Sequence, residues 1–93
     1  ENIVFLEMLR RGYKINIGRV HNEEIDFVCR KNNETIYIQV AYLLATEETI
    51  RREFDVLKKV PDNYPKFVLS MDQFDFSRDG IKHFNIPDFL TNQ

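Results

Sequence analysis

Apolar residues recur along the chain with two different spacings, and each change of spacing marks an expected element. Within residues 1–11 they fall close to the i, i+3, i+4 spacing of one helix face: Ile3, Phe5, Leu6, Met8 and Leu9. Gly12 stands where the end of a helix favours a left-handed residue. The pattern therefore predicts a first helix that ends at Gly12.

A period of two residues follows and predicts a three-stranded meander. Tyr13–Val20 alternates apolar with polar residues, and residues 21–23 offer turn chemistry before a second strand, Glu24–Lys31. Asn32-Asn33 tolerates the positive φ that a two-residue turn demands. A third strand, Glu34–Ala41, should therefore fold straight back.

The spacing returns to that of a helix after Thr46, whose side chain can cap the N-terminus. Glu47-Glu48 suits the positive end of the helix dipole, and Lys58-Lys59 closes the C-terminal end. The residues expected on the buried face are Ile50, Phe54 and Leu57. These features predict a second helix.

Two short strands and a helical turn complete the expected order. Phe67–Leu69 is continuously apolar, which favours a strand inside the sheet. Ile81–Ile86 is expected to be the last strand, and Pro87 to open a final helical turn. The order αβββαβ with a short βα tail predicts an α/β fold, with residues 1–93 forming a single domain.

The expected hairpin turn fixes which residues of the second and third strands oppose one another. Because Lys31 would face Glu34, the numbers of opposing residues sum to 65. One face of the pair is then apolar: Ile25, Phe27, Cys29, Ile36, Ile38 and Val40. On the other face Asp26 opposes Gln39, so these two side chains should nearly touch.

Composition excludes several classes of function. The 93 residues carry 13 Lys and Arg against 15 Asp and Glu, a net charge of -2, so any contact with nucleic acid is expected to be local and weak. No apolar run approaches the ~20 residues of a membrane span, so no membrane partner is expected. The single cysteine, Cys29, favours a reducing cytoplasm over a disulfide or zinc scaffold.

Several short motifs, taken in order, carry a resemblance to a known family. An acid on the first helix, Glu24-Ile25-Asp26-Phe27-Val28 and Gln39-Val40-Ala41 resemble the core of the PD-(D/E)XK nucleases. With Arg11-Gly12-Tyr13 and Tyr37–Tyr42, the set resembles more closely the C-terminal domain of unknown function of prokaryotic AAA-type ATPases. The resemblance covers nearly the whole chain.

This resemblance implies a restriction-endonuclease-like αβββαβ core with a mixed central sheet flanked by helices. It also implies a preceding P-loop ATPase domain. The motif GxxxxGK[ST] does not occur in the sequence, and the first residue already belongs to a helical pattern. We therefore expect this chain to be the C-terminal fragment of a longer ATPase.

Transferred position by position, the resemblance gives four site residues. Glu1 matches the acid of the first helix, Asp26 the metal-bridging Asp, Gln39 the (D/E) and Ala41 the Lys. Mg²⁺ takes anionic oxygen ligands, and the Lys helps to stabilise charge on the reacting phosphate. Gln39 offers an uncharged oxygen and Ala41 offers nothing, so we expect no cleavage and no cofactor.

Three functions stay open on these residues. The leading hypothesis is a non-catalytic, nuclease-like accessory domain of an AAA-type ATP-binding protein, which would contact a protein partner or its own ATPase domain. The first alternative is a nuclease with a variant site, in which Mg²⁺ or Mn²⁺ binds Glu1 and Asp26 beside Gln39. The second is an oligomerisation module. Asp26 is otherwise a solvated strand residue.

The remaining candidates receive ordinary interpretations beside functional ones. His21 and His83 have no second His or Cys at ligand spacing and are interpreted as ordinary polar residues. Phe74 and Phe76 are expected to pack back onto the core, with an exposed contact surface as the alternative.

Basic residues are expected to form a solvated surface, with phosphate contact as the alternative. This set comprises Arg10, Arg11, Lys14 and Arg19. A cation that replaces the missing Lys would have to come from Lys14, Arg30 or Lys31, and the last two lie toward the expected hairpin turn, away from Ala41.

Overall fold

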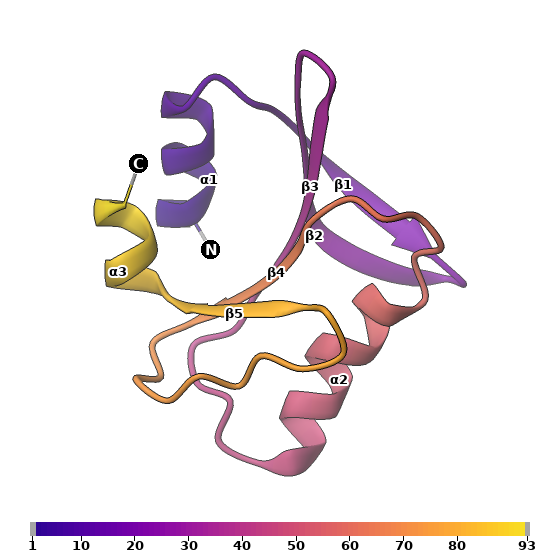
Figure 1. Ribbon diagram of the computed structural model, residues 1–93, viewed down its shortest axis with the longest axis vertical. Helices are drawn as coiled ribbons and strands as arrows, with labels where there is room; N and C mark the ends of the chain where they lie inside the picture. The colour runs from indigo at the N-terminus through magenta and orange to yellow at the C-terminus, as the bar shows by residue number, and fades with distance from the viewer. Residues whose placement is uncertain (1, 93) are drawn as a thin grey trace.

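A computed structural model describes residues 2–92, whose strands form one sheet in the order β1-β2-β3-β4-β5 (Figure 1). The elements are α1 (Asn2–Arg10), β1 (Lys14–Val20), β2 (Glu23–Lys31), β3 (Glu34–Val40), α2 (Glu47–Lys58), β4 (Lys66–Ser70), β5 (Lys82–Asn85) and α3 (Ile86–Thr91). Strands β1, β2 and β3 are antiparallel, whereas β3, β4 and β5 are parallel. The predicted α/β fold, with a mixed sheet flanked by helices, is confirmed.

Local signals set most of the element boundaries. Gly12 has a positive φ of 94° just after α1. The side-chain oxygen of Thr46 accepts a hydrogen bond from the backbone N–H of Thr49 at 3.1 Å, which caps α2 as predicted. The last strand is shorter than expected because Asn85 caps α3 through the N–H of Asp88, so Ile86 begins a helix instead of ending a strand.

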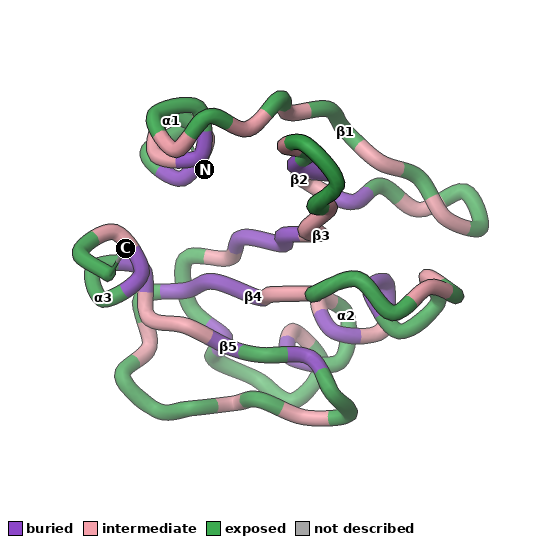
Figure 2. The backbone as a smooth tube through the Cα atoms, turned by 45° about the horizontal axis from the view of Figure 1, so that its top comes forward, coloured by how far each residue is buried: buried purple, intermediate pink, exposed green. Residues whose placement is uncertain are grey.

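Each face of the sheet carries its own apolar cluster. Helix α2 covers one face, whereas α1 and α3 lie on the other (Figure 1). The α2-face cluster comprises Ile25, Val28, Leu44, Ile50, Phe54, Val56, Leu57, Val68 and Ile81. The α1/α3-face cluster comprises Val4, Met8, Cys29, Ile38, Val40, Leu69, Ile86 and Phe89. Buried stretches lie along the central strands, and most of the loops are exposed (Figure 2).

The register of β2 and β3 is as predicted over half of its length. Lys31 faces Glu34, and the ladder continues to Phe27 and Ile38. It ends there, so the predicted regular pairing of Asp26 with Gln39 and of Ile25 with Val40 is wrong. The placement of Ile25 on the face of Phe27 and Cys29 is also wrong, because Ile25 belongs to the α2-face cluster with Val28.

A β-bulge explains both corrections. Between the pairs Asn16–Val28 and Gly18–Ile25, one residue of β1 faces two residues of β2, Asp26 and Phe27. The extra residue reverses the alternation of side chains, which turns Ile25 to the other face and bends β2. Bulges commonly redirect side chains beside functional sites. Here the bulge includes Asp26, the residue that the sequence analysis predicted as a possible metal ligand.

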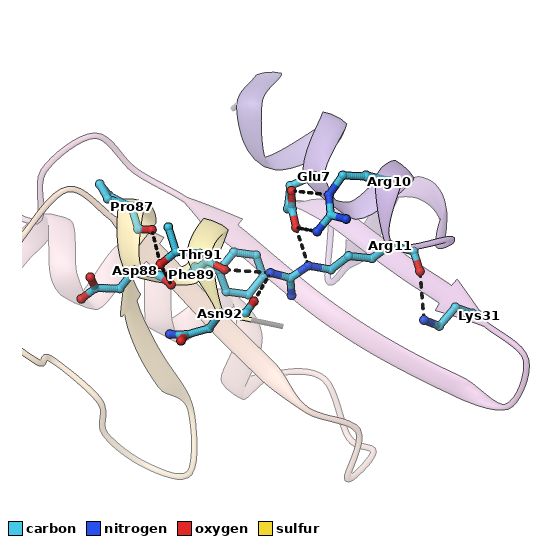
Figure 3. A network of polar contacts seen from close by, with 9 residues as sticks. All are labelled: Glu7, Arg10, Arg11, Lys31, Pro87, Asp88, Phe89, Thr91 and Asn92. Atoms are coloured by element: carbon cyan, nitrogen blue, oxygen red, sulfur yellow. Dashed lines mark hydrogen bonds and ion pairs between the residues drawn. The ribbon is translucent and has the colours of Figure 1, made fainter.

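The arginine that follows α1 joins the two ends of the chain (Figure 3). Arg11 forms an ion pair with Glu7 at 2.6 Å and donates to the backbone oxygens of Phe89 and Asn92 at 2.7 and 2.6 Å. Its guanidinium also lies 4.5 Å from the centre of the Phe89 ring. Arg11 therefore fastens α3 against α1 and satisfies carbonyls at the C-terminal end of α3.

Cys29 lies at the centre of the sheet with no exposed surface. Burial raises the pKa of its thiol to about 11, because the apolar surroundings disfavour the thiolate. The side chain therefore acts as a small apolar group in the core. None of the helices between residues 2 and 92 is long and apolar enough to cross a bilayer.

Candidate functional site

The clearest match to the predicted site is a hollow of about 340 Å³ where β2 and β3 diverge beneath α2. Its lining is polar apart from two valines: Glu23, Glu24, Asp26, Gln39, Val40, Arg52, Glu53 and Val56. The structure therefore brings Asp26 and Gln39 together, as the hairpin register predicted.

Asp26 and Gln39 bridge the gap between the diverging strands. The Gln39 side-chain oxygen accepts the backbone N–H of Asp26 at 2.7 Å, and the Asp26 carboxylate accepts the backbone N–H of Val40 at 2.9 Å. Each side chain thus provides the acceptor that a regular antiparallel ladder would supply from the opposite backbone. Asp26 and Gln39 therefore have a structural role, which is to hold β2 and β3 together beyond the bulge.

Glu53 of α2 is a site residue that the sequence analysis missed. Its carboxylate accepts a hydrogen bond from the Gln39 amide nitrogen at 3.3 Å, and Arg52 lies 3.8 Å from its other oxygen. A signal was present, because Glu53 lies three residues after Ile50 and four before Leu57, next to the buried face of α2. An acid at that position needs a polar partner on the sheet beneath the helix.

Two of the transferred positions contribute no polar group to the described site. Glu1 lies outside the described residues. Ala41 packs against the α2-face cluster, and its backbone N–H donates to the Leu69 oxygen at 2.9 Å. The position that corresponds to the catalytic Lys is therefore apolar.

The candidate replacement cations lie at the other end of the sheet. Lys14 pairs with Arg30, and Lys31 pairs with Glu34 beside the hairpin turn. Lys31 donates to the backbone oxygen of Arg11 at 2.9 Å. The cation that does line the hollow is Arg52, whose side chain is largely exposed.

The hollow is lined by four carboxylates, those of Glu23, Glu24, Asp26 and Glu53, and by the Gln39 amide oxygen, which is already hydrogen-bonded. Between residues 2 and 92, no group of three or more His, Cys, Asp or Glu side chains is arranged to hold a metal ion. The described part of the hollow can therefore attract a cation or a hydrogen-bond donor, but its carboxylates do not converge as a set of metal ligands.

The basic residues on and after α1 are engaged with an acid. Arg10 forms an ion pair with Glu7 at 2.7 Å, in addition to the Arg11 contact described above. Hydrogen bonds from Arg10 and Arg11 lower the pKa of Glu7 to about 2. Arg19 pairs loosely with Glu24 at 3.5 Å. The exposed side chains of Arg10 and Arg19 fit the solvated-surface interpretation. That interpretation is wrong for Arg11, which is only 19% exposed and binds backbone oxygens at the end of α3.

A second polar cluster was not anticipated. His83, interpreted above as an ordinary polar residue, is only 6% exposed and lies 2.7 Å from the hydroxyl of Ser70, which has no exposed surface. The two phenylalanines of the neighbouring loop differ in burial. Phe76 packs on the α2-face cluster as expected, whereas Phe74 is 69% exposed, so the expectation that Phe74 packs on the core is wrong.

Comparison with known proteins adds one relative. An uncharacterized protein from Haemophilus influenzae is 41% identical over 91 residues, which cover 97% of this chain. The chain spans about a fifth, 22%, of the length of that relative. No protein-family model matches the sequence.

Proposed function

We propose that this chain is a non-catalytic, nuclease-like accessory domain of a longer, ATP-dependent protein. The observation that carries the proposal is the use of Asp26 and Gln39 as bridges between β2 and β3. Both side chains accept backbone N–H groups at 2.7–2.9 Å, which occupies oxygens that a catalytic metal would need. The residues at the motif positions therefore have a structural reason to be present.

The chemistry at the other motif positions supports the same conclusion. A metal-dependent phosphodiesterase needs anionic ligands and a donor that stabilises the phosphate as charge develops. Gln39 carries no charge, and Ala41 has an apolar side chain that packs against the α2-face cluster. Loss of one such transition-state contact typically lowers a rate by roughly 10²-fold or more.

The accessory role draws support from the relative in Haemophilus influenzae, of which this chain matches 22%. A domain that accounts for a fifth of a longer protein acts beside other parts. The partner that we propose is the ATPase portion implied by the motifs, in the reducing cytoplasm that a single buried Cys29 favours.

Glu53 favours a second candidate function, a divalent-metal-dependent nuclease. Its carboxylate shares the hollow with Asp26 and reaches Gln39, so it could replace the acid lost at position 39. Asp26 and Glu53 would hold Mg²⁺ or Mn²⁺, which would supply positive charge to a phosphate, and Arg52 of the same hollow would add a second cation.

One experiment separates the two functions. The chain is incubated with single- and double-stranded DNA and RNA in Mg²⁺ and then in Mn²⁺, beside three variants: Asp26→Asn, Glu53→Gln and Glu48→Gln. Asp26→Asn keeps an acceptor for the Val40 N–H, and Glu48 is an exposed acid on α2 that serves as the matched control.

The accessory function predicts no cleavage by any of the four proteins, and no Mn²⁺ binding in calorimetry that depends on Asp26 or Glu53. Cleavage by the parent chain and by Glu48→Gln, lost in both Asp26→Asn and Glu53→Gln, would establish the nuclease and refute the accessory proposal.

A further inference from the structure

A chain of buried hydrogen bonds runs from β5 to the loop after β3. The His83 Nε2 atom lies 2.7 Å from the Ser70 hydroxyl oxygen, and that hydroxyl lies 2.7 Å from an oxygen of Asp72. The same Asp72 oxygen accepts the backbone N–H of Leu44 at 2.7 Å. The network thus links β4, β5, the loop that joins them and the segment before α2.

The direction of each hydrogen bond follows from one backbone group. The N–H of Phe76 points at the Nδ1 atom of His83 at 3.3 Å, so Nδ1 must be the unprotonated nitrogen. Nε2 then carries the hydrogen and donates to Ser70, whose hydroxyl donates to Asp72. This order is the reverse of a hydrolytic triad, in which the serine donates to the histidine. Ser70, fully buried, is not a nucleophile here.

Neutral His83 is therefore a condition for the hydrogen bond that holds Phe76 of the 71–81 loop in place. A protonated imidazole carries hydrogens on both nitrogens, so Nδ1 would present a donor to the Phe76 N–H. Two donors cannot share a hydrogen bond, and the Phe76 contact would break. The Phe76 ring also packs edge-on against the His83 ring, with centroids 5.5 Å apart, so it would lose that contact as well.

We propose that the loop of residues 71–81 is a proton-sensitive flap, held closed by neutral His83 and released when the imidazole is protonated. Released, the loop would lose the anchor of Phe76 on the His83 ring and uncover the part of the α2-face cluster beneath Phe76. The inference goes beyond the proposed function and does not depend on the Asp26 hollow.

The surroundings of His83 act on its protonation in opposite directions. Burial lowers the pKa of His83, whereas Asp72 and Asp75 on the flap raise it, and burial prevails. Asp88 of α3 lines the same small hollow, and β4 contributes the uncharged Ser70. Lys82, the neighbour of His83 on β5, is exposed. Opening the flap would admit water to the imidazole and relieve the burial that disfavours its charged form, so the released state would bind the proton more readily.

Hydrogen exchange of the full chain tests the proposal. Amide exchange is measured at pH 7.5 and pH 5.0 and corrected for the intrinsic pH dependence of exchange. We expect protection of residues 71–81 to fall at least about tenfold at pH 5.0, a change of about 1.4 kcal/mol in the free energy of opening. Protection of α2 and of β2 should change much less.

Two variants assign the effect. His83→Asn keeps an acceptor for the Phe76 N–H but cannot be protonated, so its flap should stay closed at both pH values. His21→Gln removes the exposed histidine of the β1–β2 turn and should behave as the parent chain. Should His83→Asn fail to fold, the ¹⁵N chemical shifts of the His83 ring in the parent chain still show when Nδ1 becomes protonated.

Loss of flap protection in step with the His83 ring titration, absent in His83→Asn, would support the proposal. Unchanged protection at 71–81 while the ring titrates would overturn it. A loss of protection as large throughout the domain as at residues 71–81 would also overturn it, because protonation would then unfold the chain instead of opening the flap.

Discussion

Two polar clusters lie within the apolar framework of this domain, and they differ in their access to water. The Asp26–Gln39–Glu53 cluster lines an open hollow, and its hydrogen bonds replace part of a strand ladder. The Ser70–His83 pair is buried, and its hydrogen bonds tie a loop to two strands. Asp26 of the first cluster is partly exposed to water, whereas Ser70 of the second has no exposed surface, so these two residues should respond differently to the same kind of change.

The largest expected effect is a contrast between the two clusters. Ser70→Ala leaves the His83 Nε2–H without an acceptor and removes a donor from Asp72, so we expect a loss of about 3 kcal/mol, given roughly 1–3 kcal/mol for each orphaned group. Asp26→Ala should lose only about 1 kcal/mol, since water can reach the Val40 N–H. Urea denaturation of both variants measures the two values, and equal losses would contradict the contrast.

The next effect concerns the bulge that shapes the hollow. A Cβ added at Gly18 would lie 2.5 Å from a methyl carbon of Val28 and 3.3 Å from the Ile25 Cβ. We expect Gly18→Ala to destabilise the fold by about 2 kcal/mol, because overpacking typically costs roughly 1–3 kcal/mol. Asn16→Ala, an exposed change on the same strand, is the control and should stay within about 0.5 kcal/mol of the parent in thermal denaturation.

A smaller effect would turn the open cluster into a metal site. Gln39→Glu keeps an acceptor for the Asp26 N–H but places a third carboxylate beside Asp26 and Glu53. We expect a loss of up to about 1 kcal/mol in EDTA, from repulsion of like charges.

Added Mn²⁺ should reverse that loss in Gln39→Glu and have little effect on the parent chain. A divalent ion at 100 times its Kd would add about 2.7 kcal/mol. Thermal melts with and without Mn²⁺ measure the response. The double variant Gln39→Glu/Asp26→Asn should respond less, and an equal response would place the ion elsewhere.

The smallest expected effect is a pH dependence of stability. The folded-state pKa of His83 is lowered from 6.5, so below pH 6.5 the unfolded chain binds a proton that the folded chain excludes. The free energy of unfolding should therefore fall as the pH drops from 6.5 toward the folded-state pKa. His83→Asn should lack this slope, whereas His21→Gln should keep it, in urea titrations at stepped pH.

A second, more acidic loss belongs to Glu7, whose pKa is lowered from 4.5 to about 2. Its ion pairs with Arg10 and Arg11 contribute fully above pH 4.5 and are lost as the pH falls through about 2. Glu7→Gln should remove the acidic loss and leave the His83 slope unchanged, which keeps the two windows separate.

Local chemistry made most of the fold predictable. The Thr46 cap and Gly12 act within a few residues, and the structure places both where the sequence put them. The hairpin turns at Asn32-Asn33 as predicted, but only Asn32 has the positive φ that was expected at both positions. The same register predicted that Asp26 and Gln39 meet. The alternation of residues could not reveal the extra residue of the bulge, because both faces of the sheet are covered and an apolar residue such as Ile25 can be buried on either one.

Long-range packing decided the rest of the site. Glu53 joins Gln39 only because α2 crosses the sheet above β3, and no pattern within the helix fixes that placement. Ser70 and His83 meet across neighbouring parallel strands thirteen residues apart in the chain, without a shared motif. A serine after a buried strand and a histidine within a short one were the available signals, and each is common on its own.

The buried Cys29 thiol is an internal probe of unfolding. A thiol must ionise and meet its reagent before it can be alkylated, and the native sheet hinders both steps. Because the chain contains a single cysteine, every alkylated molecule records an event that opened its centre. Movement of the 71–81 loop alone would leave the Cys29 thiol buried and unlabelled. The rate of alkylation therefore reports global opening separately from local release of the loop.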